Sequence, residues 1–141
     1  AVLETAGEDL VRSVLAPALR ESTGEMRLRA LFRLWLKWLA SEERRGGCPL
    51  VSAATELADR PGELRDFLVD QQESWIDHIR RMSQKAVAEA NFREGLDTRQ
   101  FAFEFHSIVL GFHFARRLLV DESALAHASV ALEKLIGAAK R

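Results

Sequence analysis

The sequence has 141 residues, of which 48% are hydrophobic and 29% are charged. This length and this balance are typical of one folded domain with a hydrophobic core, and they exclude a disordered or collagen-like chain. Lysine and arginine number 20 against 21 acidic residues, so the net charge of -1 argues against a domain that binds nucleic acid through its own positive charge.

Local features disfavour two further classes of protein, membrane-spanning and disulfide-bonded. The longest stretch without Asp, Glu, Lys or Arg, from Phe105 to Ala115, has eleven residues, whereas a membrane-spanning helix needs roughly 20. Cys48 is the single cysteine and forms no disulfide within the chain. Because no basic-then-apolar leader is visible before the first helix, we expect a cytoplasmic protein. The chain begins at Ala1 without an initiator Met, so we expect a further segment upstream.

Helix-favouring residues dominate the sequence. Ala, Leu, Arg and Glu are abundant, β-branched residues are sparse, and three prolines and eight glycines interrupt the pattern. We therefore predict an all-α fold, a single helical bundle of about six helices over residues 1–141. The first helix is expected from roughly Leu3 to Leu19, perturbed near Pro17 because proline has no N–H to donate. Gly24 is expected to end the turn that follows.

The second helix is predicted from about Glu25 to the glycine pair Gly46 and Gly47. Its apolar residues recur at spacings of three and four, which is the spacing of one helical face. They are Leu28, Leu31, Phe32, Trp35, Trp38 and Leu39. The later boundaries fall at prolines and at aspartates that can cap a helix, Asp97 and Asp121. They predict helices over about 49–59, 61–89, 97–119 and from 121 onward.

The helix predicted from Asp97 has two apolar faces, because five of the eight phenylalanines lie between Phe101 and Phe114. One stripe comprises Phe101, Phe105, Ile108 and Phe112. A second stripe lies on another side, since two residues of helix turn by about 200°. A helix that is apolar on two opposite faces must be buried on both. We therefore predict that one stripe meets the core and that the other meets a second subunit.

The predicted dimer pairs the last two helices with their symmetry mates in a four-helix interface. Ser107 and Gly111 leave room for a close helix approach, and the last helix is rich in alanine. The predicted interface residues are Phe103, Ser107, Leu110, Gly111, Phe114, Leu118, Leu125, Leu132 and Ile136. The alternative is that both apolar surfaces are covered within one chain.

A family resemblance is carried by short motifs around the middle of the chain. They are Gly46-Gly47-Cys48-Pro49-Leu50, Glu56, Asp59, Arg60-Pro61-Gly62 and Arg65-Asp66. Together they resemble the C-terminal domains of TetR/AcrR-family transcriptional regulators, and Ala1 to Ala6 looks like the linking helix of that family. The resemblance implies a homodimeric bacterial repressor whose helical domain binds an effector. It also implies that operator DNA is bound and released by a helix-turn-helix domain expected upstream of Ala1. The alternative is a stand-alone helical homodimer that serves as a small-molecule carrier or scaffold.

Aromatic side chains from three predicted helices suggest a ligand site, because bulky apolar walls with a few polar groups are typical of small-molecule pockets. The candidate ligand-binding residues are Trp35, Trp38, Phe67, Gln71, Trp75, Phe101, Phe105, His106 and Phe112. Gln71 and His106 are the polar members that would orient a small apolar or amphipathic effector. The alternative is that the whole set is plain hydrophobic core.

No metal, other cofactor or enzymatic activity is expected. Of the four histidines, His106 and His113 are seven residues apart, roughly 10 Å along a helix, which is too far to share a metal directly. Cys48 follows a glycine pair at an expected helix start, where a reactive thiolate is one interpretation and a small buried residue is the other. The sequence has no phosphate-binding loop, nucleophile elbow or zinc-protease motif.

Overall fold

The structure is a computed structural model that describes residues 2–41 and 49–141. These two ranges form helices and contain no strand, which confirms the all-α prediction. The first helix runs through α1 (Val2–Leu10), the π-helical segment η1 (Val11–Leu15) and α2 (Ala16–Leu19) without a break. Five more follow: α3 (Gly24–Leu39), α4 (Pro49–Leu57), α5 (Glu63–Ala88), α6 (Thr98–Arg117) and α7 (Ala124–Lys140).

The predicted perturbation near Pro17 takes the form of the π-helical segment η1. Proline has no N–H for the helical ladder, and its ring crowds the carbonyl group four residues earlier. The backbone is widened over Val11–Leu15 and returns to α-helical geometry at Ala16, one residue before Pro17. Widened turns of this kind are rare in helices and tend to occur at functional positions.

The start of α3 differs from the prediction that Gly24 ends a turn. Thr23 caps the helix, with its side-chain oxygen accepting a hydrogen bond from the Met26 N–H at 3.1 Å, and Gly24 is the first helical residue. Gly24 is buried where α3 crosses α5, and a Cβ atom there would lie 2.5 Å from the backbone nitrogen of Ala86 and the carbonyl oxygen of Met82. The glycine therefore permits a close helix crossing that periodicity alone does not reveal.

The two aspartates predicted to cap helices differ in the structure. Asp97 caps α6, because its carboxylate accepts hydrogen bonds from the backbone N–H groups of Arg99 and Gln100. Asp121 is not the cap of α7; it accepts from the Ser123 N–H at 2.8 Å within the preceding turn, and the helix starts at Ala124. Helix α3 ends at Leu39, before the predicted glycine stop, which lies outside the described residues.

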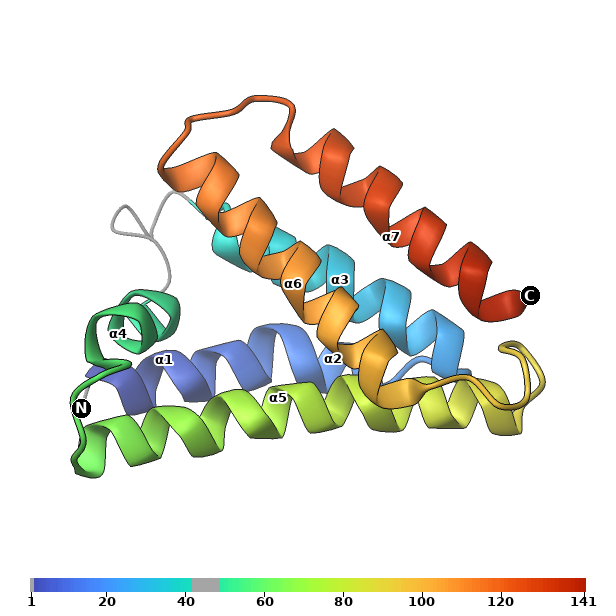
Figure 1. Cartoon of the computed structure of the whole chain (residues 1–141), viewed down its shortest axis with the longest axis horizontal. Coiled ribbons are helices and arrows are strands. Elements are labelled where there is room, and N and C mark those ends of the chain that lie inside the picture. The colour runs from blue at the N-terminus through green and yellow to red at the C-terminus, as the bar shows by residue number, and fades with distance from the viewer. Residues whose placement is uncertain (1, 42–48) are drawn as a thin grey trace.

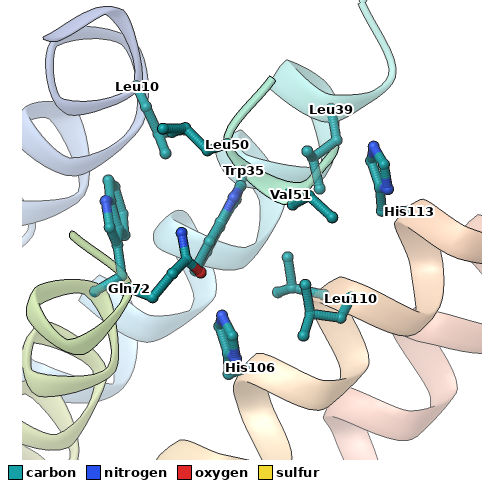
Figure 2. A pocket seen from close by; sticks show the side chains of 11 residues that line it. Leu10, Trp35, Leu39, Leu50, Val51, Gln72, His106, Leu110 and His113 are labelled. Carbon is teal, nitrogen blue, oxygen red and sulfur yellow. The ribbon is translucent and has the colours of Figure 1, made fainter. Parts of the chain in front are cut away.

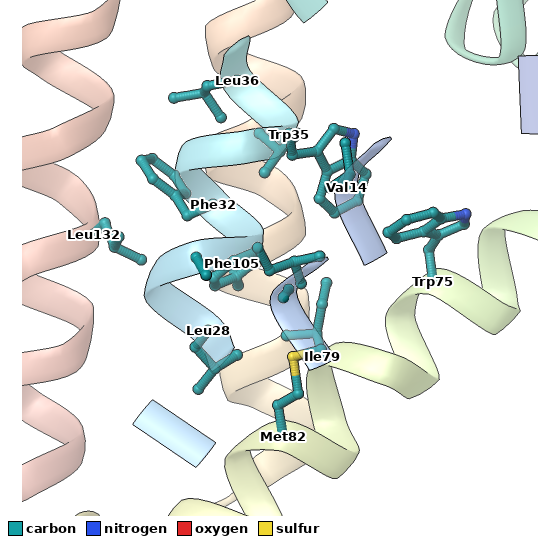
Figure 3. Close-up of a cluster of buried hydrophobic side chains, with 14 of the residues drawn as sticks. Val14, Leu28, Phe32, Trp35, Leu36, Trp75, Ile79, Met82, Phe105 and Leu132 are labelled. Atoms are coloured by element: carbon teal, nitrogen blue, oxygen red, sulfur yellow. The ribbon is translucent and has the colours of Figure 1, made fainter. Parts of the chain in front are cut away.

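Helix α6 lies across α5 and runs beside α7, with α3 packed against both α5 and α6 (Figure 1). Their shared core is drawn in Figure 3, where side chains from η1, α3, α5, α6 and α7 belong to one hydrophobic cluster. Phe32 and Phe105 make an edge-to-face contact at the centre of this core, with ring centroids 5.8 Å apart. The arrangement leaves one side of α6 facing the core and the other facing outward.

Ionic contacts fasten α7 to α3. Arg29 bridges Glu25 and Glu133, and Lys140 approaches the Glu25 carboxylate at 2.9 Å. Burial raises the pKa of Glu25, but hydrogen bonds and the positive charges of Lys140 and Arg29 leave that pKa below its usual value. The last helix is therefore held by apolar packing on one side and by charge pairing at its rim.

Candidate functional site

A small cavity lies where α1, α3, α4, α5 and α6 converge (Figure 2). The space open to the centre of a water molecule is about 10 Å³, which is room for roughly one water. None of the described residues that line it carries a formal charge. The lining consists of Leu10, Trp35, Leu39, Leu50, Val51, Gln72, Trp75, His106, Val109, Leu110 and His113.

The cavity has an aromatic wall built from three helices. The rings of Trp35 and Trp75 lie 4.8 Å apart with their planes tilted by 43°, and the His106 ring lies 6.1 Å from that of Trp35. Both tryptophans are buried, and their contacts tie α3 to α5. The structure thus brings together three of the residues predicted for the ligand site.

His106 contributes a polar ring nitrogen to this wall. Its Nε2 atom is buried and has no hydrogen-bond partner among the described residues. Burial lowers the pKa of His106, so the imidazole is neutral at pH 7 and offers one donor and one acceptor nitrogen. The lining contains a second histidine, His113. Its pKa is also lowered, mainly by burial and to a smaller extent by the positive charge of Arg117.

The glutamine that lines the cavity is Gln72, next to the predicted Gln71. Gln72 lines the cavity, whereas the amide of Gln71 lies against Gly7 of α1, where a Cβ atom would come within 2.2 Å of its Nε2 atom. Neighbouring helical residues point about 100° apart, so periodicity with an error of one residue exchanges them. The Oε1 atom of Gln71 is nevertheless buried with no hydrogen-bond partner among the described residues.

The other predicted ligand residues lie outside the cavity lining. Phe101 and Phe105 belong to the core beneath α6, and Phe112 is buried on the same face. Phe67 is half-buried against the core. The Nε1 atom of Trp38 donates a hydrogen bond to the Asp9 carboxylate at 2.9 Å, which ties α3 to α1 beside a separate groove.

Several lining residues were not predicted, because they are placed by the convergence of helices that sequence periodicity treats one at a time. They are Leu10, Leu39, Leu50, Val51, Gln72, Val109, Leu110 and His113. The sequence pattern predicts Leu110 on the opposite, subunit-facing stripe. It lies at the boundary between the two faces of α6 and is partly exposed.

A surface groove of about 590 Å³ runs between α5 and α6. It shares His106 and Leu110 with the cavity, so these two side chains separate the two spaces. Asp77 on its rim pairs with Arg80 and Arg81 at 3.3 and 2.9 Å. Acidic and basic groups on this rim therefore largely neutralise each other.

An exposed apolar face lies on the outward side of α6. Phe103 is 65% exposed and Leu118 is 66% exposed, and Phe114 and Leu125 are also exposed. A Cβ atom at Gly111 would have nothing within 4 Å. Such a surface on a folded chain is typical of an interaction site. The residues Phe103, Ser107, Leu110, Gly111, Phe114 and Leu118 form this surface, the exposed α6 face.

Two of the predicted interface residues, Leu132 and Ile136, lie on the side of α7 that faces its own chain. Leu132 is 5% exposed and Ile136 is 1% exposed, and with Ala128 and Ala139 they form the buried stripe of α7. Residues four apart share a helical face, so this stripe meets the core and Leu125 points outward. The exposed surface is accordingly centred on α6, with α7 contributing less than predicted.

Within 2–41 and 49–141, no three His, Cys, Asp or Glu side chains gather as metal ligands would. No helix formed by the described residues has the length and hydropathy needed to cross a bilayer. Cys48 lies outside the described residues, so both interpretations of its thiol stay predictions.

The comparison with family models identifies the domain. The model described as tetracyclin repressor-like, C-terminal domain matches residues 24–132, a range that includes the aromatic wall and all of α6. None of the curated proteins compared with the chain matches it. Because the match spans most of the sequence and agrees with the all-helical structure, the chain belongs to the tetracyclin repressor-like, C-terminal domain family.

Proposed function

We propose that this domain binds a small apolar or amphipathic effector and forms a homodimer, and that it thereby controls a TetR-type repressor. The observation that carries the proposal is the uncharged aromatic cavity inside a chain of this family. DNA would be bound by an N-terminal helix-turn-helix domain, since the net charge of -1 does not suit contact with phosphates.

The small size of the cavity couples the binding of a guest to the positions of the surrounding helices. Its present volume admits roughly one water, so a larger guest requires the surrounding helices to move. Leu10 of α1 and Leu50 of α4 are part of the lining, which makes those helices sensitive to what the cavity holds. An effector that prefers the expanded arrangement shifts the population toward it, and this difference in affinity is the basis of allosteric control.

The exposed α6 face supports dimerisation. Apolar surface gains about 25 cal/mol per Å² when it is removed from water, and Phe103, Phe114 and Leu118 present bulky apolar side chains there. Two copies related by a two-fold axis would use the same patch on each subunit. Gly111 lies in this patch with open space above it, so a facing helix can approach closely.

Light scattering tests the dimer. The wild-type domain is expected to show twice the subunit mass at micromolar concentration, and Leu118→Glu is expected to show the mass of one subunit. Leu64→Glu is the matched control, because Leu64 is 48% exposed on α5, away from the exposed α6 face. A wild-type protein of one subunit mass, or equal effects of the two variants, would contradict the proposal.

Effector binding is tested on the full regulator. Native mass spectrometry of the purified protein is expected to reveal a bound small molecule, and adding that molecule is expected to release operator DNA. Trp75→Ala should weaken this response more than it lowers dimer stability, since Trp75 forms the aromatic wall. An unchanged response with a collapsed melting temperature would show that Trp75 is plain core. The coding sequence upstream of Ala1 is expected to encode the helix-turn-helix.

A further inference from the structure

His106 and Leu110 separate the buried cavity from the groove between α5 and α6. They are four residues apart on α6, so their side chains lie one above the other on the same side of the helix. Both line the cavity and both line the groove. Moving the Leu110 side chain would join a space for roughly one water to a groove of about 590 Å³. The groove therefore offers a route to the cavity past Leu110, and the lining helices still have to move to hold a guest larger than one water.

The lining determines which chemistry the cavity accepts. No formally charged group is present among its described residues, so a buried carboxylate or ammonium ion would have no opposite charge to offset its desolvation. Trp35 and Trp75 pack on each other with ring centroids 4.8 Å apart, so the pair presents a continuous apolar aromatic wall to the cavity. Figure 2 shows His106 and Gln72 directed toward the same space from α6 and α5.

The unpartnered Nε2 atom of His106 favours a guest that carries a hydrogen-bonding group. A buried group without a hydrogen-bond partner is costly, and a purely apolar guest would leave the His106 Nε2 atom in that state. A hydroxyl group can donate to a nitrogen lone pair or accept from an N–H, so it suits either tautomer of the neutral imidazole. His113 lies in the same lining but already has an interaction partner.

We propose that the cavity binds an uncharged, largely apolar compound that carries one hydroxyl group, that His106 Nε2 bonds this hydroxyl, and that the compound enters from the α5–α6 groove past Leu110. This inference rests on the proposed ligand-binding function and specifies its chemistry. His106 is thereby the specificity-determining residue of the site. The tryptophan pair supplies contact area that does not distinguish a hydroxyl from a methyl group.

Three probes of similar shape test the ligand chemistry: phenol, toluene and benzoate. At pH 7 they are respectively neutral with a hydroxyl, neutral without one, and anionic. Their affinities are measured by NMR titration of the indole N–H resonances of Trp35 and Trp75, with Trp38 as a reference outside the cavity. Phenol is expected to bind and benzoate is not. In His106→Leu the ratio of phenol to toluene affinity is expected to fall about tenfold, the effect of losing one buried hydrogen bond.

The matched control is His113→Leu, which removes the other histidine of the lining and is expected to change the ratio less than twofold. An unchanged ratio in His106→Leu, a fall in His113→Leu instead, or tighter binding of benzoate would overturn the proposal. Absence of any phenol-dependent shift at millimolar concentration would also overturn it. That last outcome leaves the proposed function standing if a charged or larger effector is found bound to the regulator.

The access route has its own test. Leu110→Ala removes the side chain that separates the groove from the cavity, so phenol should exchange at least several-fold faster in NMR exchange measurements. The ratio of phenol to toluene affinity should stay within twofold, because His106 is unchanged. An unchanged exchange rate would overturn the route while the assignment of His106 is decided separately by the affinity ratio.

Discussion

The close crossing of α3 and α5 predicts that Gly24→Ala destabilises the domain. A Cβ atom on residue 24 would lie 2.5 Å from the Ala86 nitrogen and from the Met82 carbonyl oxygen, whereas ordinary contacts of this kind begin at 3.4 Å. Both neighbours are backbone atoms of α5, so no side-chain rotation can relieve the contact. The two helices must therefore separate locally by about 0.9 Å.

The expected cost follows from this separation. Overpacking a well-filled core typically costs about 1–3 kcal/mol, and a gap of 0.5–1 Å forfeits a quarter to a half of the dispersion energy of the facing atoms. Alanine is a better helix former than glycine by up to about 1 kcal/mol, which offsets part of the loss. The shift also disturbs the hydrogen bond from the Gly24 N–H to the Glu89 carboxylate, which measures 2.7 Å. We expect a net loss of about 2 kcal/mol in the free energy of unfolding.

Urea unfolding followed by circular dichroism measures this loss. With a slope of about 2 kcal/mol per M, the midpoint should fall by about 1 M. Gly137→Ala is the control, because the nearest atom to its Cβ would be an Arg141 nitrogen at 3.9 Å. That variant should raise the midpoint through helix propensity alone. Both are compared at one protein concentration, since dimer stability depends on it. A Gly24→Ala protein as stable as the wild type would refute the reasoning.

Three further predictions concern pH and hydrogen bonding. Burial acts to raise the pKa of Glu25, but the hydrogen bonds and charges of Lys140 and Arg29 outweigh it and leave the pKa below 4.5. The contribution of Glu25 to stability is therefore complete above the unfolded pKa of 4.5 and is lost as the pH falls through the lower pKa of the folded state. Glu25→Gln should therefore flatten the fall in urea midpoint between pH 6 and pH 3.5. Burial lowers the pKa of His106, so stability declines as pH falls below 6.5, by at most about 1.4 kcal/mol per pH unit, and His106→Leu should reduce that decline. Trp38→Phe removes the hydrogen bond to Asp9 and should cost about 1 kcal/mol in urea unfolding without changing phenol affinity.

Much of the fold follows from local chemistry that is readable in the sequence. The carboxylate of Asp97 satisfies the first backbone N–H groups of α6 wherever that helix packs, so its start was predictable. The spacing of Phe101, Phe105 and Phe112 likewise identified the core-facing side of α6. Ile108 is half-buried and Val109 fully buried, because the buried arc of the helix is wider than a single stripe.

Features that depend on how helices cross were not predictable in the same way. Gly24 resembled a turn glycine, since nothing near it in sequence shows that α5 passes within contact distance. Leu132 and Ile136 formed an apolar stripe that periodicity cannot assign to the core or to a partner. The sequence pattern predicts Gln71 in the cavity lining, but Gln72 lies there. The two differ by one position on the helix, and apolar periodicity does not fix the orientation of a helix more finely than that.

The aromatic cavity and the exposed α6 face share helix α6. Leu110 belongs to both, because it lines the cavity and is also partly exposed on the outward side. A guest that displaces Leu110 therefore alters the surface on which a second subunit is proposed to pack. Thermodynamic linkage then makes the effect reciprocal, so phenol affinity should change between protein concentrations below and above the dimer dissociation constant. Titrations that give one affinity at both concentrations would show that α6 carries two independent sites.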